Sequence, residues 1–179
     1  ASGFEPEGRE FESLRARQFA WVHTKDKRKT PMKWTLQRMA DRFGIEDLLV
    51  EYCHIIDTKQ FDRLNEVFAD DAWIDYTAMG GAAGNLEEIK TFLKQAMPVF
   101  PNTQHMIANH QIRLDGDVAT GRIMCFNPMQ MELGEQGRPV FFLGLWYVDE
   151  YVRTGHGWRI SRRVEEKSWA FNVPSCLKL

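Results

Sequence analysis

The chain has 179 residues, of which 44% are hydrophobic and 27% are charged, and its formal net charge is −2. A chain of this length and composition folds around its own core without disulfides or bound metal, which argues against a disordered or fibrous protein. The small net charge gives no general affinity for nucleic acid, and no apolar run reaches the roughly 18–20 residues of a membrane span. We therefore expect a cytoplasmic protein that binds neither nucleic acid nor membrane. Its three widely spaced cysteines are expected to be reduced thiols.

Residues 1–36 are predicted to form a basic, non-catalytic extension. Residues 1–38 carry nine Lys or Arg against five Asp or Glu, and Pro6, Gly8 and Pro31 interrupt them. Such an arm would also suit an acidic partner, but its weak periodicity favours an appendage. The domain itself is predicted over residues 37–175.

Helical patterns come first in this domain. Apolar residues recur at helical spacing from Ile45 to Ile56 and predict an amphipathic helix over residues 37–57. A short helix over 61–69 and a strand over 70–76 follow. Asn85 is then a predicted N-cap for a helix over 86–97, since acidic residues occupy its first turn.

The remainder of the chain is typical of strands. Turn signals separate four candidate strands, at residues 103–114, 118–126, 139–153 and 157–169. Helices followed by consecutive strands predict an α+β fold. We expect a cone-shaped barrel made of a strongly curved, mainly antiparallel sheet, with the N-terminal helices packed in its concave face and a pocket between them.

Asp57 lies at the end of the first predicted helix. The helix dipole disfavours a carboxylate there, and burial without a partner would cost far more. If Asp57 leans inward with the neighbouring apolar stripe, another group must therefore satisfy it. The alternative is an exposed aspartate that ends the helix in a turn.

His105 lies near the start of a predicted strand. Alternation places His105, Ile107 and Asn109 on one face and His110 on the other. A lone strand histidine is often structural, held by a single hydrogen bond. Because the two histidines are expected on opposite faces and no clustered ligand spacing occurs, we expect no metal site.

Three stretches resemble SnoaL-like members of the nuclear-transport-factor-2-like superfamily. They are IEDLLVEYCHIIDTKQFDRLNEVFADDAWIDY, QHMIANH and YVDEYVRTGHGWRI. The resemblance spans residues 40–172 and is greatest to the branch that contains scytalone dehydratase, hexachlorocyclohexane dehydrochlorinase and bile-acid 7α-dehydratase. It implies a lyase that needs no cofactor and forms a homo-oligomer, with a trimer favoured.

The resemblance also implies roles for individual residues. In this branch an aspartate that ends the first helix orients a histidine at the start of the second strand, and Asp57 and His105 have the matching separation. A polar residue five positions before the aspartate polarises the substrate, and here it is Tyr52. A basic residue five positions after the tryptophan of the last strand is Arg163, although the adjacent Arg162 leaves this register open.

The chemistry of these residue types supports the same assignment. A neutral imidazole is the usual general base near neutral pH, and a carboxylate fixes its tautomer and stabilises the imidazolium that forms. A tyrosine hydroxyl or a guanidinium then stabilises developing negative charge. We expect Tyr76, Ile107 and Trp146 to line a pocket for a small hydrophobic cyclic substrate.

Two alternatives stay open at this stage. A ketosteroid-isomerase-like proton shift would share the fold and a tyrosine, although its base comes from another position. A non-catalytic module, like the β subunit of a ring-hydroxylating dioxygenase, would share the fold but lack the Asp–His pair.

Overall fold

The computed structural model describes residues 34–178, in which two α-helices and seven strands are joined by turns and short 3-10 helices. The predicted extension at 1–36 lies outside the described residues except for its last three. The elements are α2 (Leu36–Asp57), β1 (Phe68–Asp75), β2 (Ala83–Asn85), α3 (Leu86–Ala96), β3 (Asn102–Thr103), β4 (Met106–Asp115), β5 (Val118–Gln130), β6 (Val140–Thr154) and β7 (Gly157–Phe171). No helix within residues 34–178 has both the length and the apolar character needed to cross a membrane.

Helix α2 occupies the segment that periodicity predicted, and its apolar stripe is buried against the sheet. Asp41, near its start, is buried; it accepts a hydrogen bond from the Trp158 indole at 3.3 Å and pairs with Arg153 at 2.7 Å. These contacts fix the N-terminal half of the helix to β6 and β7. Lys59, two residues beyond the helix, has a φ of 59°, and this left-handed conformation turns the chain away.

Asn85 is the N-cap of α3, as predicted, and forms a capping box with Glu88. The helix predicted over 61–69 is shorter, because only Phe61–Glu66 form a 3-10 helix. Strand β1 then begins at Phe68, which pairs with Ile160 on β7, so sheet pairing overrides the local helical pattern.

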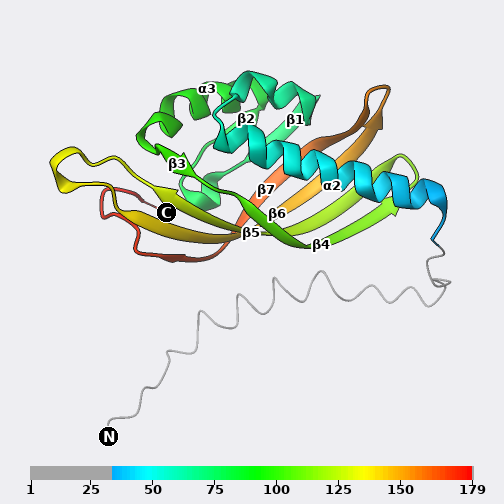
Figure 1. Ribbon diagram of the computed structural model, residues 1–179. Coiled ribbons are helices and arrows are strands. Elements are labelled where there is room, and N and C mark those ends of the chain that lie inside the picture. Colours follow the sequence, from blue (N-terminus) through cyan, green and yellow to red (C-terminus); the bar gives the residue numbers. More distant parts are fainter. Residues whose placement is uncertain (1–33, 179) are drawn as a thin grey trace, which may run out of the picture. The chain divides into compact units, whose positions relative to one another are not determined.

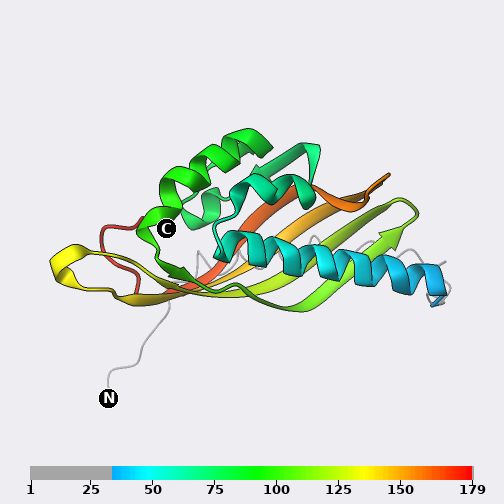
Figure 2. The same cartoon turned by 45° about the horizontal axis from the view of Figure 1, so that its top comes forward.

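The seven strands form one sheet in the order β2-β1-β7-β6-β5-β3, with β4 also paired to β5. Only the β1–β7 pair is parallel, which confirms the mainly antiparallel prediction. The sheet is strongly curved and open rather than closed, and α2 lies across its concave side (Figures 1 and 2). The predicted α+β cone with helices in the concave face is confirmed in this open form.

A β-bulge in β4 corrects the predicted alternation after His105. The register shifts between Ala108 and Gln111, and Asn109 between them has a φ of 52°. His110 is therefore turned toward α2, where its Nδ1 lies 3.5 Å from Glu46. The prediction that the two histidines face opposite sides was wrong, because an extra residue resets the period of two.

Candidate active site

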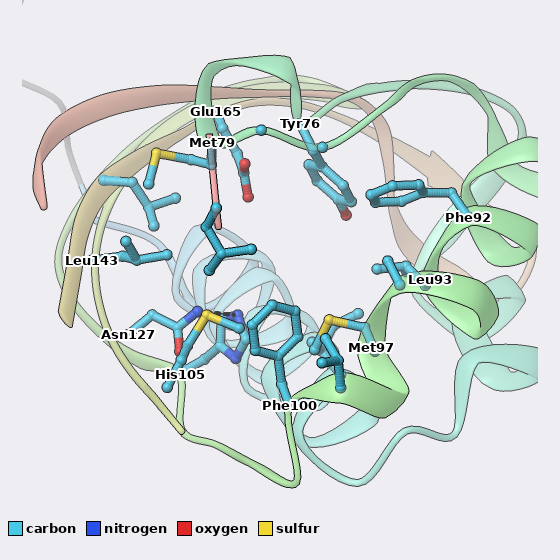
Figure 3. Close-up of a pocket in the computed structure, with 18 of the residues that line it drawn as sticks. Tyr76, Met79, Phe92, Leu93, Met97, Phe100, His105, Asn127, Leu143 and Glu165 are labelled. Atoms are coloured by element: carbon cyan, nitrogen blue, oxygen red, sulfur yellow. Dashed lines mark hydrogen bonds between the residues drawn. The ribbon is translucent and has the colours of Figure 1, made fainter. Parts of the chain in front are cut away.

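A cavity of about 290 Å³ lies between the helices and the inner face of the sheet (Figure 3). Most of its wall is apolar, with Phe100, Met97, Leu93 and Leu143 among the residues that line it. An apolar cavity of about 150 Å³ holds benzene, so this volume suits a molecule of about two rings. The polar side chains in its wall include Tyr52, Tyr76, His105, Asn127 and Glu165.

Asp57 and His105 meet at one side of this cavity. The Nδ1 atom of His105 lies 2.6 Å from Asp57 Oδ1, and the His105 backbone N–H donates to Oδ2 at 2.8 Å. The Thr103 hydroxyl donates to Oδ1 at 2.9 Å. These donors satisfy the carboxylate at the unfavourable end of α2, and they come from β3 and from the two-residue link between β3 and β4.

The electrostatics of Asp57 follow from these contacts. Partial burial opposes its ionisation, but the hydrogen bonds and attraction from His105, together with Thr103, outweigh it and hold the pKa of Asp57 below its ordinary value. An ionised Asp57 only accepts hydrogen bonds, so His105 carries its hydrogen on Nδ1. The other ring nitrogen, Nε2, is then the atom that exchanges a proton.

Asn127, on β5, lies 3.1 Å from Nε2 of His105. Its amide is best satisfied when the nitrogen donates to the carbonyls of Gln104 and Pro128, each at 3.2 Å, and the oxygen faces Nε2. A protonated ring then donates to Asp57 on one side and to Asn127 on the other.

Tyr52 and Tyr76 form a second polar group in the wall, with their hydroxyls 2.9 Å apart. Burial raises the pKa of both phenols above the ordinary value, so both keep their protons near neutral pH. One hydroxyl hydrogen is used between them. The remaining one is free to donate to a substrate oxygen.

The structure places Arg163, and not Arg162, on the inner side of β7. Arg163 is fully buried and makes two hydrogen bonds to Asp149, at 2.8 and 2.6 Å, whereas Arg162 is half-exposed near Glu150. The guanidinium lies 4.0 Å from the centre of the Tyr52 ring. It is not among the residues that line the cavity, and its contact with the cavity wall is through the ring of Tyr52.

Two predicted pocket residues do not line the cavity, while Tyr76 does. Trp146 points to the convex face, where Arg122 stacks on it at 4.0 Å, because alternation along β6 turns Leu145 and Tyr147 inward instead. Ile107 packs against the core just before the β4 bulge and does not reach the cavity.

Sequence reasoning missed Asn127 and Glu165, both of which line the cavity. Asn127 alternates with Cys125 and Met129 on the buried face of β5, and Glu165 lies two residues after Arg163 on β7. This alternation along β5 and β7 was the signal in the sequence that could have placed both residues on the inner face of the sheet. A polar residue in a buried strand register was not recognised as part of the pocket. Within residues 34–178, no group of three or more His, Cys, Asp or Glu side chains is placed to hold a metal ion.

Residues 37–164 match the SnoaL-like domain family, and the chain belongs to that family. It is 47% identical over 133 residues to the uncharacterized proteins Rv2910c of Mycobacterium tuberculosis and Mb2934c of Mycobacterium bovis. Each alignment covers 74% of this chain and 89% of the relative.

Solved structures share the fold. The Kfla4162 protein of Kribbella flavida has a TM-score of 0.70 and 27% identity, with 75% of this chain and 95% of that chain covered. Hexachlorocyclohexane dehydrochlorinase LinA-type3 of Novosphingobium barchaimii has a TM-score of 0.67 and 18% identity, with coverage of 80% and 97%. A protein provisionally named a scytalone dehydratase, from Novosphingobium aromaticivorans, has a TM-score of 0.69 and 18% identity, with coverage of 78% and 92%.

Proposed function

We propose that this protein is a cofactor-independent lyase that removes a proton from a small hydrophobic cyclic substrate and expels water or a halide. The observation that carries the proposal is the Asp57–His105 pair, 2.6 Å apart in the wall of an apolar cavity. The dehydrochlorinase and the dehydratase with the same fold add support at the level of architecture.

Each polar group has a role in this scheme. His105 Nε2 takes a proton from a ring carbon, while Asp57 and Asn127 stabilise the imidazolium that results. The free hydroxyl of the Tyr52–Tyr76 pair donates to a substrate oxygen and stabilises negative charge that develops there. Arg163 holds the Tyr52 ring in place and contributes a positive charge behind it.

The test is a screen of cyclic alcohols and cyclic halides with wild type and two histidine variants. We expect wild type to form an alkene from at least one compound, and His105→Ala to lose that activity while its circular dichroism spectrum is unchanged. His110→Ala is the matched control, because His110 lies five residues further along the chain, on β4, and outside the cavity. Full activity of His105→Ala would disprove the proposal. A product of unchanged mass would indicate an isomerase instead.

We also propose that the convex face of the sheet mediates homo-oligomer formation, with a trimer favoured. Phe126 and Phe142 stack there with ring centres 5.7 Å apart, and Trp169 and Phe171 extend this aromatic patch while remaining exposed. A patch of aromatic side chains on one face is typical of a protein interface. The cavity lies on the other side of the sheet, so association through the convex face would not cover it.

A further inference from the structure

The mechanism above leaves two titratable residues of the cavity wall without a role, Glu165 and Lys178, and the sheet carries one of them, the carboxyl of Glu165. It projects into the cavity from the wall that also carries Tyr76, while His105 and Asn127 occupy another part of the wall (Figure 3). Among residues 34–178 no side chain or backbone group forms a hydrogen bond or ion pair with it. A carboxyl in that position is directed at whatever occupies the cavity.

Burial, more than the charges around it, favours the neutral form of Glu165. Arg163, on the same strand, is already paired with Asp149, and Asp75 on β1 adds a further negative charge. Burial is the largest effect, and it raises the pKa of Glu165 to about 8 against the opposing pull of Arg163. The neighbouring ionisable groups Tyr52, Tyr76, Tyr147 and Cys125 all have raised pKa values and are neutral. Glu165 therefore holds a proton at neutral pH.

We propose that Glu165 is the general acid that protonates the departing hydroxyl group, so that the leaving group is water rather than halide. This inference rests on the proposed lyase function and narrows it to a dehydratase. A chloride ion leaves without a proton, whereas hydroxide is a poor leaving group and needs one. The two tyrosines hold their protons too tightly to supply it.

The step balances without any further reactant. His105 takes the proton from carbon, the C–H electrons form the C=C bond, and the C–O bond breaks as Glu165 gives its proton to the oxygen. Water and an alkene leave behind a Glu165 carboxylate and a His105 imidazolium. Transfer of the imidazolium proton to Glu165 through solvent restores the starting state.

The geometry also defines the substrate class. The cavity suits about two rings, and the acid and the base project from different parts of its wall. We infer a bicyclic alcohol whose hydroxyl lies on the carbon next to the one that loses the proton, with a carbonyl that acidifies this proton and accepts the tyrosine hydrogen bond.

The experiment uses 3-hydroxy-1-indanone and 3-chloro-1-indanone, which give the same product, 1-indenone. Relative to wild type, we expect Glu165→Gln to lose about 10²–10⁴-fold in rate with the hydroxy ketone and far less with the chloro ketone. An equal loss with both, or no loss with the hydroxy ketone, would overturn the assignment. Glu166→Gln is the control, because Glu166 pairs with Arg122 on the outer face.

Two further measurements separate this inference from the proposed function. His105→Ala should lose both reactions, and if it keeps both, the base assignment fails whatever Glu165 does. Infrared difference spectra of wild type minus Glu165→Gln need no substrate. They should show a protonated carboxyl at pH 7 that ionises toward pH 9, and an ionised carboxyl at pH 7 would overturn the inference even if neither indanone reacts.

Discussion

The guanidinium of Arg163 lies 4.0 Å from the centre of the Tyr52 ring and does not reach the cavity. It is held there by Asp149, and both side chains are fully buried. The centre of the Tyr147 ring lies 4.1 Å from the same guanidinium and 5.6 Å from the centre of the Tyr52 ring. The buried ion pair therefore packs against the Tyr52 and Tyr147 rings on the side away from the cavity.

Replacing Arg163 by Met leaves Asp149 buried without its partner. Removal of one member of a buried pair costs about 3–5 kcal/mol, and we expect a loss of this size in the free energy of unfolding, measured with urea. Asp149→Leu together with Arg163→Met should regain part of it, because no unpaired charge remains. A single variant as stable as wild type would contradict this account.

Asp57→Asn keeps the shape of the side chain but removes the negative charge beside His105. An amide no longer fixes the Nδ1 tautomer or stabilises the imidazolium, so we expect the turnover number to fall about 10²–10⁴-fold while the circular dichroism spectrum shows that the variant stays folded. The comparison is with Asp47→Asn, an exposed position of the same helix. Equal turnover in both variants would argue against the role of Asp57.

The pH dependence of stability should report on Glu165. Its folded pKa, about 8, lies above its ordinary value of 4.5, so the folded state binds more protons between these values and loses stability as pH rises through them. Glu165→Gln lacks this titration. Its melting temperature relative to wild type should therefore rise between pH 5 and pH 8 and then level off, and a constant difference would contradict the raised pKa.

Asp57 should act in the opposite direction at acid pH. Its folded pKa lies below the unfolded one, so its contribution is complete above the unfolded value, about 3.9, and is lost as pH falls through the folded value. Wild type should lose stability below about pH 4 more steeply than Asp57→Asn in urea titrations. If the free energy of unfolding of the two proteins falls equally steeply with decreasing pH, the hydrogen bonds around this carboxylate do not contribute as described.

Phe171→Asp tests the proposed oligomer interface. A charge in the aromatic patch should prevent association, so light scattering is expected to give the mass of a single chain instead of a trimer. Phe43→Asp, on α2, is the matched control, since both side chains are 64% exposed. An unchanged mass for Phe171→Asp would place any interface elsewhere.

The parts of the fold that could be predicted from the sequence depend on local periodicity. The apolar stripe of α2, the N-cap at Asn85 and the order of helices before strands are all local patterns. The bulge at Asn109 was not predictable in this way, because a single extra residue leaves no composition signal. One such residue turned His110 to the other face.

The site was predictable only where separate residues matched a family pattern. Asp57 and His105 are 48 positions apart, and only the fold brings them into contact. Glu165 and Trp146 show the limit of strand periodicity. Alternation divides the residues of a strand into two faces, but it does not say which of these faces points into the cavity. The two aromatic faces of β6 look alike in the sequence, whereas only one of them borders the cavity.

Part of the cavity wall is formed by residues that follow β7 in the chain. Leu177 and Lys178 line it, and Leu177 packs on the core. Both follow the segment 37–164 that matches the family, which contains Asp57, His105 and both tyrosines. Leu177 and Lys178 also follow Glu165, so exchanging the segment after β7 between relatives would change one side of the cavity while Asp57, His105, both tyrosines and Glu165 stay in place.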